Sequence, residues 1–233
     1  MTDYSYAARM RRRKRRRRKL IIKRLLCLSF LVLLIASICY GAVRIIGSKN
    51  REESKSIQAE SQLQKASNIK VPDWVDVQII KIHGTARSGK KLTAVKNIVI
   101  HYVGNPGTTA QNNRDFFNKS DTEVSSHFVV GLDGEIIQCV PLNEKSAASN
   151  WRNSDTISVE VCHSDESGVF NRASYNSLIR LTAWLCHEFG LDEEDVIRHY
   201  DITGKMCPLY YAEHEDKWED LKNDVKKALI EYN

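Results

Sequence analysis

Apolar and polar positions divide the chain into two contrasting parts. Residues 25–43 form an uninterrupted run without a charge, and two isoleucines extend it beyond a single arginine. A helix needs about 20 such residues to cross the hydrocarbon core of a bilayer, whereas the apolar region of a cleaved secretory signal has only about 7–15. The run therefore predicts an uncleaved transmembrane signal-anchor helix over 25–46, with cleavage near Ala36 or Ala42 as the alternative.

The charge of the chain is divided unevenly along its length. The net charge is +6, but residues 1–24, with an unbroken basic run over 11–19, carry a larger positive charge, so the remainder is mildly acidic. A basic flank on the N-terminal side of a membrane span keeps that side cytoplasmic. We expect 1–24 to be a basic cytoplasmic tail that contacts anionic lipids, and the rest to be exported. The acidic remainder gives no indication of a nucleic-acid-binding domain.

Residues 47–70 are polar and predict a linker that holds a folded domain just off the membrane. Such a segment reaches about 25–30 Å as a coil and roughly 36 Å as a helix. The composition becomes globular at Val71, and residues 71–233 are enough for one well-buried core. Six cysteines in 233 residues are too few for a disulfide-built scaffold.

Within 71–233 the apolar periodicity changes repeatedly between that of strands and that of helices. The first predicted elements are a strand buried on both faces over 97–103, a short helix through Phe117 capped by Thr108 with Gln111, and a hairpin of strands over 125–130 and 135–140. An alternating strand over 156–162 and an amphipathic helix over 174–189, closed by Gly190, follow. The last two elements are a strand from Val196 and a helix from about His214. In the alternating strand, Ser158, Glu160 and Cys162 are expected on one face and the apolar residues on the other. This order predicts an α/β domain with a mixed central sheet flanked by helices.

The segment 196–208 brings His199, Lys205 and Cys207 close together around turn residues. It predicts the end of a strand that runs into a tight loop. Imidazole and thiolate are ligands that zinc prefers, and catalytic zinc sites take three protein ligands and leave one position open. His101, at the end of a predicted buried strand, is the candidate for the third. Residue types and spacing alone leave a packed histidine and an inert loop cysteine as alternatives.

Five segments resemble, in sequence and in order, those of N-acetylmuramoyl-L-alanine amidases. They are Ile-Val-Ile-His-Tyr-Val-Gly-Asn-Pro at 98–106, Ser-Ser-His-Phe-Val-Val at 125–130, and the segments 134–141, 156–162 and 198–208. These amidases belong to the zinc amidase superfamily, which includes phage endolysins and peptidoglycan recognition proteins. The resemblance covers about residues 71–233 and implies a zinc amidase domain there.

The resemblance implies His101, His199 and Cys207 as zinc ligands, because the family uses a first-strand histidine, a late histidine and a cysteine or aspartate before a proline. It also implies catalytic roles for Glu160 and Lys205. Zinc lowers the pKa of a bound water to about 7 and polarises a carbonyl, which suits amide hydrolysis at neutral pH. Glu160 would accept the proton of the water and pass it to the leaving amine, and Lys205 would stabilise the developing oxyanion.

The sequence also departs from some relatives. Some have a catalytic tyrosine where this chain has Ser126, so Ser126 is given no catalytic role and Glu160 carries more of the proton transfer. The segment 147–151 lacks a histidine that many relatives have there. Asp201 is expected either to orient a ligand histidine or to be a plain turn residue, and His127 could be a packing residue. The remaining histidines, His163, His187 and His214, are expected to be structural or on the surface. Cys139, Cys162 and Cys186 are expected to be buried free thiols, with a disulfide among them as the alternative.

The sequence thus predicts a single-pass membrane protein with an extracytoplasmic, monomeric zinc amidase domain. Its expected reaction is hydrolysis of the amide between the lactyl group of N-acetylmuramic acid and L-alanine in peptidoglycan. The anchor favours remodelling or controlled lysis of the cell's own wall. One alternative is a non-catalytic peptidoglycan-binding module of the same fold, against which the complete set of ligands, Glu160 and Lys205 argues. Another is a phage-type lysin, with the same chemistry and an anchor that delays release.

Overall fold

The computed structural model describes residues 40, 44, 57, 61 and 63–232. The chain divides into two compact units, 1–56 and 57–233. Among the described residues, no helix is both long and apolar enough to cross a membrane. Apart from Tyr40 and Arg44, the predicted basic tail and signal-anchor lie outside the described residues, so both stay predictions.

A six-stranded mixed sheet forms the centre of the second unit. Its strands are β1 (Asp76–Val77), β2 (Asn97–Tyr102), β3 (Phe128–Val130), β4 (Ile136–Gln138), β5 (Thr156–Val161) and β6 (Val196–Arg198), in the order β1-β4-β3-β5-β2-β6. β3 and β4 pair antiparallel, whereas the other neighbouring pairs are parallel. The predicted mixed sheet, its buried strand and its hairpin are confirmed, and the two longest strands, β2 and β5, lie next to each other.

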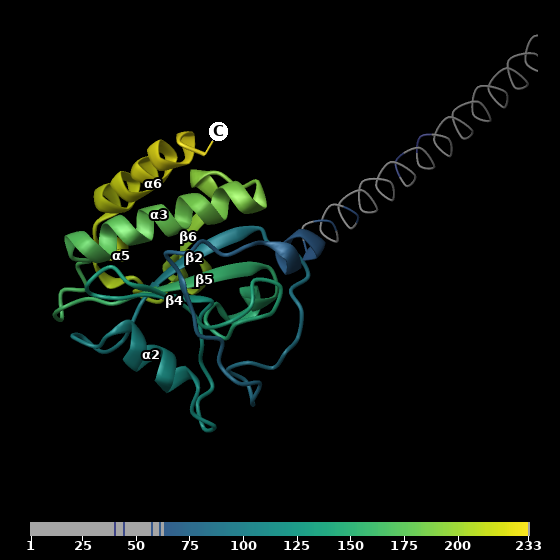
Figure 1. The fold of residues 1–233 in the computed structure, drawn as a ribbon. Helices are drawn as coiled ribbons and strands as arrows, with labels where there is room; N and C mark the ends of the chain where they lie inside the picture. The colour runs from purple at the N-terminus through teal and green to yellow at the C-terminus, as the bar shows by residue number, and fades with distance from the viewer. Residues whose placement is uncertain (1–39, 41–43, 45–56, 58–60, 62, 233) are drawn as a thin grey trace, which may run out of the picture. The chain divides into compact units, whose positions relative to one another are not determined.

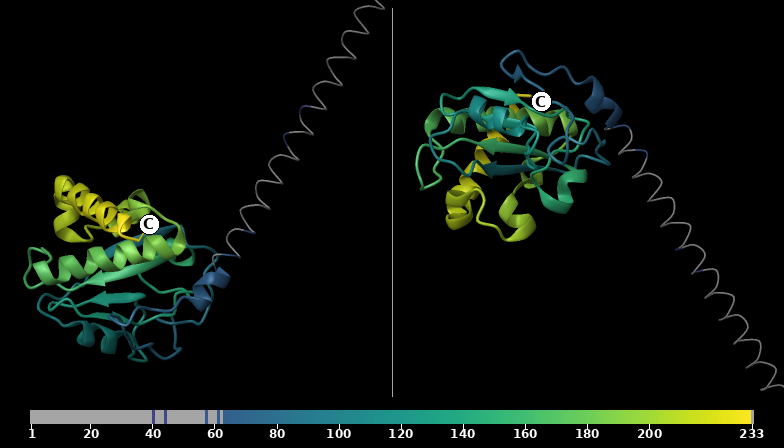
Figure 2. Two further views of the ribbon diagram at one scale, coloured as in Figure 1. Left: turned by 45° about the horizontal axis from the view of Figure 1, so that its top comes forward. Right: turned by 90° about the horizontal axis from the view of Figure 1, so that it is seen from below.

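Helices cover both faces of this sheet, as Figures 1 and 2 show. α3 (Arg172–Phe189) and α6 (Glu215–Ile230) lie on one face, and α2 (Ala110–Phe117) lies on the other. Because side chains alternate along a strand, Ile98 and Ile100 enter the larger core beneath α3, whereas Val103 joins the smaller core beside α2. Two apolar cores therefore sandwich the sheet, and the predicted α/β class is confirmed.

The helix ends follow their capping residues. Asn171 accepts a hydrogen bond from the backbone N–H of Ser174, so α3 begins at Arg172, slightly earlier than predicted, and it ends as predicted at Gly190 with φ +66°. The predicted cap of α2 is wrong by one residue. Thr109, and not Thr108, accepts from the N–H of Asn112, and the Asn112 side chain accepts in return from the N–H of Thr109.

The folded unit extends further toward the N-terminus than the predicted boundary at Val71. Residues 63–68 are helical, Ala66 is buried, and Leu63 and Ile69 pack against the larger core. The Lys65 Nζ also donates a hydrogen bond of 2.6 Å to the backbone carbonyl of Glu188. The end of the segment that composition assigns to the linker is thus part of the domain. Its three apolar positions, spaced at every third residue, form a short stripe within a polar sequence.

Short helices make several of the connections: η1 (Asn150–Ser154), η2 (Glu193–Asp195), α4 (His199–Thr203) and α5 (Leu209–Glu213). α4 occupies the place where the sequence predicts a tight loop directly after the strand. The prediction of free, buried thiols is confirmed for Cys139, Cys162 and Cys186.

Candidate metal centre and active site

The centre of the sheet places a histidine and a glutamate side by side. His101 and Glu160 are register partners on the parallel strands β2 and β5. Residues paired in register leave a sheet on the same face, so both side chains point away from the larger core. The alternation predicted for β5 is confirmed, since Val159 and Val161 belong to that larger core.

β6 and α4 deliver the second histidine to the same place. Arg198 pairs with Ile100 of β2, so His199, the next residue, lies close to His101. The two imidazole rings meet edge to face with 4.7 Å between their centroids and an interplanar angle of 60°. His199 is also the first residue of α4, whose first turn is closed by Asp201 accepting a hydrogen bond of 2.7 Å from the Arg198 N–H.

The buried side chain of Arg198 fixes α4 to the C-terminal helices. Its guanidinium lies 2.8 Å from oxygens of Asp201, Glu215 and the Tyr211 backbone carbonyl, and 5.2 Å above the ring of Trp218. Asp201 therefore binds Arg198 and not a ligand histidine. The expectation that Asp201 orients a histidine is wrong, and its role is that of a capping and turn residue.

Replacing Arg198 by methionine is expected to lower the free energy of unfolding by about 2–3 kcal/mol, because charged hydrogen bonds to Asp201 and Tyr211 are lost. Urea unfolding of the full chain would measure this. Glu215→Gln is the matched control, since the Glu215 side chain is 64% exposed and its ion pair should contribute only about 0–1 kcal/mol. Equal losses in the two variants would contradict the assignment of Arg198 as the anchor of α4.

A turn after α4 brings the cysteine back to the histidines. Gly204 ends the helix with φ +76°, a left-handed conformation that glycine adopts without the strain of a Cβ. The Tyr200 N–H then donates a hydrogen bond of 2.9 Å to the carbonyl of Cys207. As a result, the Cys207 Sγ lies 3.8 Å from Nδ1 of His101.

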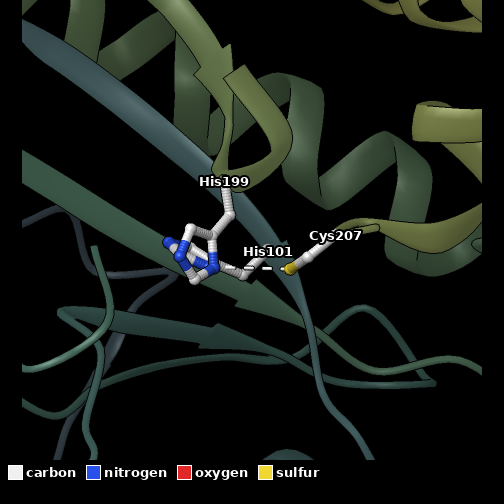
Figure 3. A group of neighbouring side chains, drawn as sticks. All are labelled: His101, His199 and Cys207. Carbon is white, nitrogen blue, oxygen red and sulfur yellow. Dashed lines mark hydrogen bonds between the residues drawn. The ribbon is translucent and has the colours of Figure 1, made fainter. Parts of the chain in front are cut away.

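His101, His199 and Cys207 therefore form one buried cluster, which Figure 3 shows. One donor atom from each residue lies within 4.8 Å of the other two. Two imidazoles and one thiolate are a donor set of catalytic zinc sites that leave one position open. Close by, the Glu160 Oε2 is buried and has no hydrogen-bond partner among the described residues. The donor chemistry and this unpaired oxygen fit a zinc ion in the cluster.

Burial prepares the two histidines for metal binding. It lowers the pKa of His101 well below its ordinary value, and the nearby His199 and Lys205 lower that pKa further. Burial and Lys205 also lower the pKa of His199. Both imidazoles are therefore neutral at pH 7, which is the form that binds a metal. By contrast, burial raises the pKa of the Cys207 thiol to about 12, so a metal must displace its proton.

Two opposing effects act on the pKa of the Glu160 carboxyl group. Burial raises its pKa to about 8, and the positive charge of Lys205 acts in the opposite direction. A carboxyl group with a pKa near neutrality can both accept and return a proton under physiological conditions. A purely structural role, in which Glu160 only pairs with a surface cation, does not fit its unpaired buried oxygen.

A pocket of about 410 Å³ opens over the cluster. Its lining includes all five residues predicted as ligands or catalytic groups: His101, Glu160, His199, Lys205 and Cys207. A second hollow of about 670 Å³ shares His199 and Lys205 with the pocket and continues past Asn150 and Glu123. We call the two hollows together the groove. Its size and the charged side chains of Glu123, Glu160 and Lys205 along it suit an extended substrate that carries polar groups.

The region that builds this site matches a known family. Residues 91–209 match the Amidase_2 family, described as N-acetylmuramoyl-L-alanine amidase. The chain belongs to the N-acetylmuramoyl-L-alanine amidase family. All five predicted site residues lie within the matched region, whereas α6 lies beyond it.

Individual amidases support the family assignment. N-acetylmuramoyl-L-alanine amidase BlyA of Bacillus subtilis (strain 168) is 34% identical over 171 residues, which cover 64% of this chain and 46% of BlyA. A mutant endolysin from Bacillus subtilis has a similar structure, with a TM-score of 0.57 and 27% identity over 65% of this chain and 97% of its own. The catalytic domain of XlyA is also similar in structure, with a TM-score of 0.57 and 26% identity over 65% of this chain and 98% of its own. This chain thus spans about half the length of the curated amidases it matches.

Two other residues of this amidase-family chain stay outside the groove. Ser126 is buried and donates a hydrogen bond of 2.7 Å to the carbonyl of Phe128. His127 is also buried, with Nδ1 accepting from the Ser158 N–H at 3.0 Å and Nε2 donating to the Glu144 carbonyl at 2.9 Å. Burial lowers the pKa of His127 to about 4. Its predicted packing role fits these contacts.

Sequence reasoning missed two polar residues that contact the candidate ligands. The Ser149 Oγ lies 3.3 Å from Nε2 of His101, and the Asn150 Oδ1 lies 2.8 Å from Nε2 of His199. Both belong to the amidase segment that the sequence marks only by a missing histidine. Short polar side chains before a helical turn indicate a cap or a turn, and nothing in their local pattern indicates contact with histidines about fifty positions away.

Proposed function

We propose that this chain is a zinc-dependent N-acetylmuramoyl-L-alanine amidase. It hydrolyses the amide between the lactyl group of N-acetylmuramic acid and the L-alanine of the peptide stem in peptidoglycan. The observation that supports this most is the convergence of His101, His199 and Cys207 within 4.8 Å, inside the region matched to the family and in a groove that also contains Glu160.

His101, His199 and Cys207 would hold the zinc ion. Bound zinc would polarise the scissile carbonyl and lower the pKa of the attacking water toward 7. The groove would bind the glycan and the peptide on either side of the scissile amide. Its fixed walls would hold the carbonyl carbon close to the cluster, which supplies part of the rate enhancement by orientation alone.

Glu160 moves the proton in this proposal. Its carboxylate accepts a proton from the water as the oxygen attacks the carbonyl carbon, and it then gives that proton to the amide nitrogen as the C–N bond breaks. The products are a lactyl carboxylate on the sugar and a free L-alanine amine. The ammonium of Lys205, which lines the same pocket, stabilises the negative charge that develops on the carbonyl oxygen.

The test is direct. The purified full chain is incubated with peptidoglycan, once with zinc and once after chelation, and new N-terminal L-alanine amines are counted. Appearance of these amines only with zinc is the expected result. No new amines with zinc present would refute the enzyme. Retention on peptidoglycan without cleavage would instead favour the alternative, a non-catalytic binding module of the same fold.

We also propose that the domain is anchored on the extracytoplasmic side of a membrane. The support comes from the sequence alone: the uncharged run 25–43 and the basic residues that precede it. Expression of the full chain followed by fractionation and protease treatment of intact cells is the test. Recovery of the full chain in the soluble fraction would refute the anchor, and resistance of 63–232 to protease outside the membrane would refute the topology.

A further inference from the structure

A single turn contacts both candidate histidine ligands. The adjacent residues Ser149 and Asn150 place Oγ and Oδ1 against Nε2 of His101 and Nε2 of His199, at 3.3 Å and 2.8 Å. Ser149 is completely buried, so its hydroxyl group is shielded from solvent. We call residues 148–153 the clamp turn, because it contacts both rings. At His101 it contacts Nε2, whereas the Cys207 Sγ lies near Nδ1.

The clamp turn is held rigidly by its own hydrogen bonds. The Asn153 Oδ1 accepts from the N–H of Ala148 at 3.0 Å and from that of Ser149 at 2.6 Å. Arg152 fixes the other end through bonds of 2.7 Å to Asp155 and 2.6 Å to the Asn97 side chain at the start of β2. The turn is therefore tied to the strand that carries His101.

Asn150 has an unusual backbone conformation. Its φ is +52°, and it is the only non-glycine residue with positive φ among the described residues of the chain. Asparagine is one of the few residues that adopt this conformation at small cost. This conformation begins η1 and places the amide of Asn150 beside His199, while the previous residue stays beside His101.

We propose that Ser149 and Asn150 are positioning residues that fix the tautomers of His101 and His199. Each accepts a hydrogen bond from an Nε2–H, so that the proton stays on Nε2 and Nδ1 of each ring is left unprotonated for a metal. An imidazole nitrogen can bind a metal only through its lone pair, and the partner of the other nitrogen decides which one offers it. One turn thereby sets both rings at once.

This proposal rests in part on the proposed zinc function, and zinc affinity is its first readout. Replacing Asn150 by glycine removes the amide but keeps the positive φ, since glycine adopts it freely. We expect Asn150→Gly to raise the Kd for zinc about 10–100-fold, the usual loss for a partner of a ligand histidine. Asn150→Asp keeps the acceptor oxygen and should bind zinc at least as tightly as the unaltered chain.

Trp151→Ala is the matched control within the same turn. Trp151 is 68% exposed and makes no hydrogen bond to either histidine, so its removal should leave the zinc Kd unchanged. Unaltered zinc affinity in Asn150→Gly, or an equal loss in Trp151→Ala, would overturn the positioning role. The thermal midpoint of each metal-free variant separates loss of the hydrogen bond from loss of the fold.

The second readout needs no metal. Long-range ¹H–¹⁵N spectra of the metal-free full chain report which imidazole nitrogen carries the proton. Both rings should show the Nε2–H form. In Asn150→Gly only His199 should become a mixture of tautomers, and in Ser149→Ala only His101. An Nδ1–H form in the unaltered chain would overturn the proposal. If the unaltered chain fails to bind zinc, the proposed zinc function is refuted. The tautomer spectra of the metal-free chain would still test the role of the clamp turn.

Discussion

Replacing Glu160 by glutamine is expected to lower kcat for peptidoglycan hydrolysis about 10²–10⁴-fold, the usual contribution of a positioned general acid–base group. Glutamine has the same shape but cannot accept and return a proton. Because Glu160 is not one of the three clustered donors, the variant should keep its zinc content. The measurement is release of L-alanine amines, with the metal content of the same sample determined in parallel.

Glu219→Gln on α6 is the matched control. It makes the same chemical change on a surface residue that forms an ion pair with Lys222, and it should leave kcat unchanged. A Glu160→Gln variant that retains full activity would remove Glu160 from the proton transfer. A variant inactive because it has lost zinc would place Glu160 among the ligands. Either result would contradict the assignment.

Removing the charge of Lys205 is expected to shift the pH dependence of hydrolysis through its effect on Glu160. The positive charge of Lys205 opposes the rise in the pKa of Glu160 that burial causes. Removing that charge by Lys205→Met should therefore raise the pKa of Glu160. Glu160 would then be deprotonated only at higher pH, so the acidic limb of the pH profile of kcat/KM should move upward. A limb that stays in place would show that the two groups do not interact in the active enzyme.

The periodicity of the sequence could predict the main elements because each forms a long or well-bounded pattern. The alternation of 156–162 fixes which face Glu160 occupies, and Gly190 marks the end of α3. The helix at 63–68 could not be recognised in the same way. Only Leu63, Ala66 and Ile69 interrupt its polar sequence, and their burial depends on a core built by segments far along the chain.

The candidate site shows the same limit. Residue types and the family resemblance point to the clustered donors, since metal chemistry restricts which side chains can serve. The partners of those donors are not restricted in this way. The sequence around Asp201 does not indicate which side chain it binds. Asp201 binds Arg198, whose guanidinium is held in place by the Tyr211 carbonyl of α5 and by Glu215 and Trp218 of α6. Ser149 and Asn150 reach their histidines only through the pairing of β2, β5 and β6.

Replacing Cys207 by alanine is expected to abolish both metal binding and hydrolysis. The loss in zinc affinity should exceed the roughly 10–100-fold cost of removing a partner of a ligand, because a bond to the metal itself disappears. Cys207→Asp is the informative counterpart, since a carboxylate is also a zinc ligand and should restore binding. Metal analysis and titration of the full chain measure both. Full zinc occupancy in Cys207→Ala would contradict the ligand assignment.

The pH dependence of zinc binding provides a sharper test of Cys207. Burial raises the pKa of its thiol to about 12, so at neutral pH the metal-free chain holds a proton that zinc must displace. Zinc affinity should therefore rise about tenfold per pH unit from this group alone. In Cys207→Asp the carboxylate is already ionised, and the slope of log affinity against pH should be smaller by about one. Since His101, His199 and Glu160 are unchanged in the variant, the difference between the slopes isolates the thiol. Equal slopes would mean that the thiolate does not bind the metal.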